Sequence, residues 1–123
     1  MHYTLLLSNP EPTPGEISPE IMMAFQSAYD RYAAALADAG VLVSIHILQP
    51  SPTATTVTLR HGEESPDRAY HDNPEKLSGI FIVDVPDHTT AMKWARECPG
   101  AEYGTVEVRP AALVYEEGRW VSA

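Results

Sequence analysis

The sequence is poor in cysteine, in basic residues and in long hydrophobic runs. Its 123 residues include one cysteine, which excludes an internal disulfide framework and a site built from several cysteines. Eight lysines and arginines stand against 17 acidic residues, and the net charge of −9 disfavours nucleic acid and anionic membranes as partners. No apolar stretch is long enough to span a bilayer, and no charged-then-apolar signal pattern follows Met1. We therefore expect a cytoplasmic protein with no nucleic-acid or membrane partner.

Patterns that hold common cofactors are also missing. The seven glycines are scattered, so the chain has no glycine-rich phosphate loop. No two histidines lie four residues apart on a predicted helix, and no His-x-His motif occurs. We predict neither a metal site nor a cofactor.

The overall composition, with 44% apolar and 20% charged residues, is that of one globular domain. Apolar residues recur every three or four positions between Ser18 and Gly40, which predicts a long helix with a capping hydroxyl at its start and a glycine at its end. A second helix is expected to begin at Asp87 and to stop at residues 98–100, with Cys98 packed on its apolar face.

Strands are predicted at residues 2–7, 41–48, 53–60, 77–85 and 105–110, because these segments are apolar, β-branched or alternating. Residues 9–16 and the polar stretch 61–76 are expected to be loops. Residues 113–121 resemble a small terminal hairpin, so we divide the chain into a domain at 1–110 and an extension at 111–123.

This element order predicts an α+β fold: a ferredoxin-like sandwich with an antiparallel sheet and two helices on one face. Ile80 and Ile82 alternate with Phe81, Val83 and Val85, so both faces of the strand at 77–85 are apolar. Because the helices can cover only one of these faces, we expect a homodimer that buries the other.

Several segments match a known family. They are HYTLLL at residues 2–7, AGVL at 39–42, LQPS at 48–51, TATTV at 53–57 and VEVRP at 106–110. Over about residues 1–110 the chain resembles the YCII-related, DGPF-domain family of the dimeric α/β-barrel superfamily. The family's Asp-Gly-Pro-Phe tetrapeptide is absent, and AYHDNPEK at residues 69–76 stands in its place.

The resemblance implies the ferredoxin-like fold and a dimer, and it supports two kinds of function. A His–Asp pair is the suspected acid–base element of YCII-like proteins, and the wider superfamily includes isomerases, dehydrochlorinases and monooxygenases. Some DGPF domains accompany sigma factors, which implies regulation without catalysis. Asp72 is our candidate for the family's aspartate.

Histidine is the natural candidate for acid–base chemistry, because its pKa is near neutral without help. His46 lies on a strand that is otherwise apolar, so we expect its imidazole to be partly desolvated, with Asp72 as its carboxylate partner. His71 is a further catalytic candidate. The structural alternatives are a histidine bonded to backbone at residue 46 and a solvated polar loop at residues 71–72.

Substrate-binding candidates are polar side chains that the first strand, the first helix and the later strands would aim at a pocket. They are Tyr3, Tyr29, Tyr32, Gln49 and Arg109. Tyrosines at such positions also occur as core residues with an outward hydroxyl. The leading interpretation is a small-molecule-pocket protein, a cofactor-independent lyase or isomerase with His46 and Asp72 as acid–base pair. The alternative is a non-catalytic ligand-sensing or partner-binding regulatory module.

Overall fold

A four-stranded antiparallel sheet forms the centre of the computed structural model, which describes residues 1–13, 15–60, 63–66 and 73–122. Its strands are β1 (His2–Pro10), β2 (Leu42–Ile47), β5 (Glu75–Asp84) and β6 (Thr105–Pro110), in the order β2-β5-β1-β6. Each neighbouring pair is antiparallel. This order, with one helix between β1 and β2 and one between β5 and β6, confirms the predicted ferredoxin-like α+β fold.

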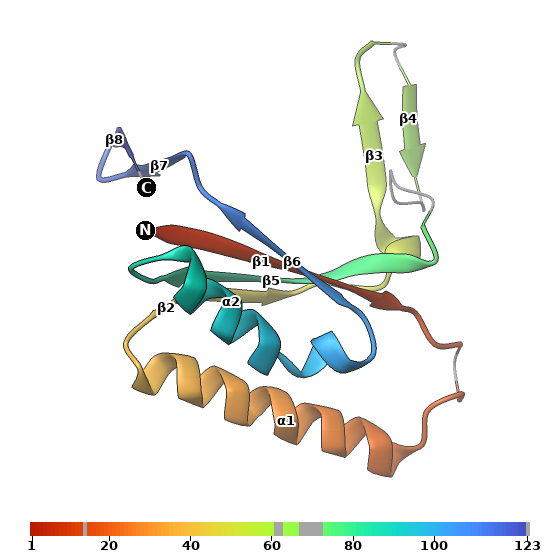
Figure 1. Cartoon of the computed structure of the whole chain (residues 1–123). Helices are drawn as coiled ribbons and strands as arrows, with labels where there is room; N and C mark the ends of the chain where they lie inside the picture. The colour runs from red at the N-terminus through yellow and green to blue at the C-terminus, as the bar shows by residue number, and fades with distance from the viewer. Residues whose placement is uncertain (14, 61–62, 67–72, 123) are drawn as a thin grey trace.

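Both helices lie on one face of the sheet (Figure 1). Helix α1 (Pro19–Asp38) begins where the Ser18 hydroxyl accepts a hydrogen bond from the Ile21 amide, and it ends before Gly40, whose φ of 73° reverses the chain. Helix α2 (His88–Glu97) is capped by the Asp87 carboxylate. The predicted helix limits are therefore confirmed.

The core fills the space between the sheet and the two helices. Phe81 and Leu5 are fully buried at its centre, and Tyr32 of α1 packs edge-on against Phe81. Trp94 and Cys98 close the core from the side of α2. Cys98 packs inside the protein, as the apolar spacing of α2 predicted.

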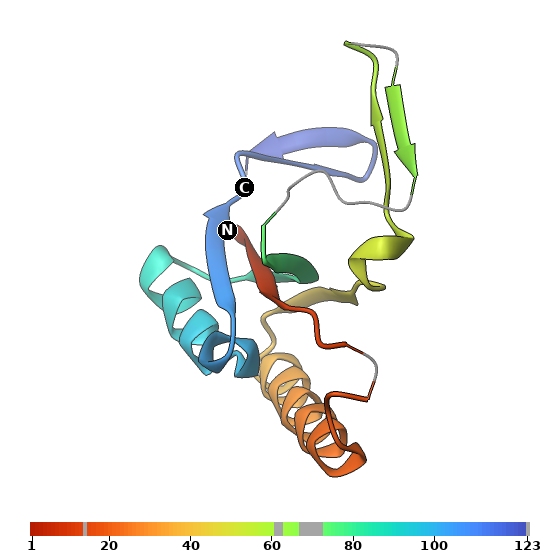
Figure 2. The same cartoon turned by 90° about the vertical axis from the view of Figure 1, so that its right-hand side faces the viewer.

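Two hairpins project from the sheet on the side away from the helices (Figures 1 and 2). One pairs β3 (Thr55–Thr58) with β4 (Glu63–Pro66), and the other pairs β7 (Leu113–Glu116) with β8 (Arg119–Ser122). The expected loop at 61–76 was thus wrong in part, because residues 63–66 form β4 and residues 75–76 begin β5. The terminal hairpin was predicted correctly.

Two short 3₁₀ turns, η1 (Ser51–Thr53) and η2 (Pro99–Glu102), follow β2 and α2. Within the residues that the structure describes, no helix has the length and apolar character needed to cross a membrane.

Candidate functional site

A cleft opens on the helix side of the sheet, at the end where β1 and β2 finish and β5 begins. It consists of two adjoining cavities of about 440 and 410 Å³, and Asn9 and Tyr103 line both of them. The outer cavity lies between the segment after β1 and the first turns of α1, and the inner one lies between α1 and the ends of β2 and β5. We call this pair of cavities the α1 cleft.

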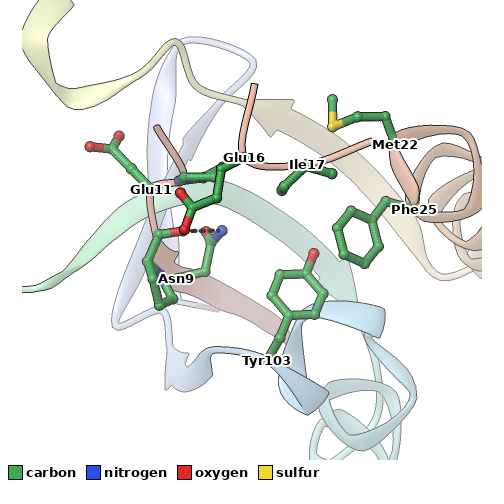
Figure 3. Close-up of a pocket in the computed structure, with 9 residues that line it drawn as sticks. Asn9, Glu11, Glu16, Ile17, Met22, Phe25 and Tyr103 are labelled. Carbon is green, nitrogen blue, oxygen red and sulfur yellow. Dashed lines mark hydrogen bonds between the residues drawn. The ribbon is translucent and has the colours of Figure 1, made fainter. Parts of the chain in front are cut away.

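The outer cavity is mainly apolar. Figure 3 shows Asn9, Glu11 and Glu16 on one side of it, and Ile17, Met22 and Phe25 on the other. The ring of Tyr103 stacks on Phe25 with centroids 5.0 Å apart. This stack supplies a flat apolar wall against which a planar molecule could lie.

The inner cavity is lined by polar groups from three elements. The hydroxyl oxygens of Tyr29 on α1 and Tyr103 after η2 are 2.9 Å apart and share a hydrogen bond. The Ser78 hydroxyl bonds to the Asn9 side chain, and Gln26 adds an amide from α1. Donors and acceptors therefore converge at the point where the two cavities meet.

Burial and the hydrogen bond with Tyr103 raise the pKa of the Tyr29 phenol well above its usual value, so this hydroxyl stays protonated and neutral. Its position depends on Gly100, because a Cβ at that residue would lie 2.7 Å from the Tyr29 oxygen and would collide with Leu7. Burial also raises the pKa of the nearby Cys98 thiol, which disfavours a reactive thiolate.

A third cavity, of about 720 Å³, lies at the base of the β3–β4 hairpin. Ser8 and Glu107, which line it, alternate along their strands with Leu7, Val106 and Val108 of the core side, so they face away from the helices. Gln49, Asn73 and Lys76 also line this cavity. We call it the open-face cleft.

Comparison with known families identifies the chain. The model of the YCII-related domain matches residues 1–113, which is nearly the whole sequence. The protein belongs to the YCII-related family. A search of curated proteins finds no match. The family match ends at Leu113, the first residue of β7.

In the single chain, His46 of this YCII-related protein is exposed and is not partly desolvated as predicted. Its neighbour Ile45 turns toward the core, and His46 pairs with Ile80 on the uncovered face of edge strand β2. No carboxylate among the described residues lies within ion-pair distance of it. His71 and Asp72 lie outside the described residues.

The five substrate-binding candidates lie in four different places. Tyr29 lines the α1 cleft and Gln49 the open-face cleft. Tyr3 and Tyr32 are core residues, and the Tyr32 hydroxyl donates to the Trp94 carbonyl oxygen at 2.8 Å. Arg109 is exposed on the uncovered sheet face, 3.6 Å from the Glu107 carboxylate.

The sequence analysis missed Asn9, Gln26, Ser78 and Tyr103. Asn9 and Ser78 lie in irregular stretches of paired strands, where the register shifts, and no sequence period predicts that they meet. Tyr103 follows the Pro-Gly stop of the second helix, outside any periodic segment, so no pattern in the sequence predicts its stacking on Phe25. Among the described residues, no group of His, Cys, Asp or Glu could hold a metal ion.

Proposed function

We propose that this YCII-related protein binds a small organic molecule in the α1 cleft. The Tyr29–Tyr103 hydroxyl pair carries the proposal, because it places hydrogen-bonding groups where an apolar and a polar cavity meet. Binding sites for small molecules are typically concave, mainly apolar and provided with a few converging polar groups.

The test is a thermal-shift screen of a metabolite panel on wild type and Tyr103→Phe. A ligand that binds the folded state raises the melting temperature. We expect hits whose shifts shrink in Tyr103→Phe and persist in Tyr115→Phe, which removes the same hydroxyl from the distant β7–β8 hairpin. Hits whose melting-temperature shifts are the same in Tyr103→Phe would show that the ligand binds elsewhere.

Acid–base catalysis by His46, Asp72 and His71 is the second candidate function, a lyase or isomerase reaction without a cofactor. Two observations support it. The sheet face that carries His46 and Arg109 also carries the open-face cleft. Asn73, which is next to Asp72 in the sequence, lines that cleft. In this proposal His46 is the base and Asp72 orients it.

Deuterium exchange tests this candidate. Panel compounds are incubated with the protein in heavy water, and incorporation of deuterium at carbon is followed by NMR. Catalysis predicts incorporation that His46→Asn and Asp72→Asn abolish and that His2→Asn leaves intact. Binding without exchange in the wild type would favour the non-catalytic ligand-sensing module.

A further inference from the structure

The charges around the α1 cleft are of one sign. Its described lining residues include no lysine, arginine or histidine, and the only charged ones are Glu11 and Glu16. Both carboxylates are held in place: Glu11 accepts from the Ser51 amide at 2.6 Å, and Glu16 accepts from the Thr13 amide at 2.6 Å. An anionic ligand would therefore meet fixed negative charge at the outer cavity and no cation in the inner one.

The net charge of −9 adds to this local field, because a chain of that charge repels anions at longer range. An ionised group that leaves water without a partner is penalised far more than a neutral one. The inner cavity compensates neutral groups well, since the Tyr29–Tyr103 pair offers both a phenolic proton and oxygen lone pairs.

Size and shape restrict the apolar part of the ligand. The outer cavity, of about 440 Å³, is walled by the Phe25–Tyr103 stack and by Ile17 and Met22. A flat ring system fits beside such a stack, and its polar end would then point past Tyr103 into the inner cavity.

We infer that the α1 cleft takes neutral amphipathic molecules, each with a flat apolar body and one uncharged hydrogen-bonding head group, and that it rejects the corresponding carboxylates. This inference rests on the proposed function, whose site it uses.

The experiment uses two probes of nearly equal shape, 2-naphthamide and 2-naphthoate, titrated into the protein at pH 7.5 by calorimetry. We expect the amide to bind at least about tenfold more tightly than the carboxylate, because only the carboxylate must give up the hydration of a full charge. Tyr103→Phe should weaken the binding of 2-naphthamide several-fold.

A gain-of-binding variant makes the test independent of any loss of stability. Gln26 is an exposed residue of α1 that lines the inner cavity, so Gln26→Arg places a cation beside the head group. We expect this variant to bind 2-naphthoate more tightly than 2-naphthamide.

The outcomes separate the two proposals. Equal binding of both probes, weakened by Tyr103→Phe, overturns the preference for neutral ligands and leaves the cleft as the binding site. Binding of neither probe overturns the ligand class, while hits from the metabolite panel that depend on Tyr103 would still support the cleft. Binding that Tyr103→Phe does not change overturns both.

Discussion

Gly100 is the residue on which the geometry of the inner cavity depends most directly. The space that a Cβ would need is occupied by the Leu7 side chain and the Tyr29 hydroxyl. Overpacking of this kind costs about 1–3 kcal/mol, so Gly100→Ala should lower the free energy of unfolding by that amount, measured by urea denaturation. Adding Tyr29→Phe removes one of the two obstacles and should restore part of the loss. Unchanged stability of Gly100→Ala would contradict the close approach.

Asp87 couples the stability of α2 to pH. The Thr90 hydroxyl and amide donate to one carboxylate oxygen at 2.7 and 2.8 Å, and these bonds hold the pKa of Asp87 below its usual value of 3.8. The unfolded chain then takes up the proton at a higher pH than the folded one, so the contribution to stability is complete above pH 3.8 and is lost as the pH falls below it.

Asp87→Asn should therefore lower the melting temperature at pH 6 and have a smaller effect at pH 3. Asparagine still caps a helix but has no charge to lose. Thermal unfolding at the two pH values checks this, with Asp38→Asn, outside any such cap, as the control. An effect of equal size at both pH values would show that the carboxylate's charge is irrelevant.

Sequence reasoning at the residue scale depended on periodicity, which assigns a side chain to a face but does not say whether that face is covered. The alternation of β5 correctly separated Phe81 from Ile80. His46 was placed on an apolar strand, yet its exposure depends on β2 being an edge strand on whose outer face none of the described residues packs. Only the order of the strands could supply that fact.

Helices were predicted more accurately than loops, for a physical reason. Ser18, Gly40 and Asp87 act on their own helix ends through local hydrogen bonds and backbone dihedral angles, and local signals are visible in the sequence. Strand β4 has no apolar alternation of its own, and it exists because β3 pairs with it. Polar strands of this kind are determined by their partner.

The β7–β8 hairpin is an element that can be removed to test the domain boundary. Tyr115 and Trp120 pair across it with ring centroids 5.1 Å apart, and both side chains are at least 60% exposed. Only Val114 and Val121 are half-buried, so little of the core depends on the hairpin.

A chain that ends at Ala112 keeps the hydrogen bond from the Ala111 amide to the His2 carbonyl. We expect it to fold with the same circular dichroism spectrum, to melt only a few degrees lower and to keep the ligand binding that we propose for the α1 cleft. The control is a chain that ends at Gly104, which lacks β6 and should not fold. Failure of the Ala112 chain to fold would make the hairpin part of the domain.

The sheet face opposite the helices bears on the oligomeric state of the protein. Leu6, Ile80 and Ile82 are half-buried on this face, while Glu107, Arg109 and His46 surround them. An apolar centre with a polar rim is typical of a protein–protein interface. We propose that two copies of the chain pack through this face.

Light scattering should then report twice the chain mass of 13.5 kDa at micromolar concentration. Ile82→Glu places a charge at the centre of the proposed interface and should give monomers that remain folded. Met23→Glu is the matched control, because Met23 is 67% exposed on α1 at the other side of the sheet. A wild-type mass of 13.5 kDa would refute the dimer.

The net charge predicts how the proposed dimer would respond to salt. Two chains that each carry −9 repel one another, and the repulsion is screened as the Debye length shrinks from about 30 Å at 0.01 M salt to about 8 Å at 0.15 M. The apolar contact through Leu6, Ile80 and Ile82 is not weakened by this screening. The dimer should therefore dissociate at a higher protein concentration in 0.01 M salt than in 0.15 M salt, as sedimentation velocity can measure. An opposite trend would mean that ion pairs across the rim, such as Arg109 with an acidic residue of the second copy, hold the two chains together.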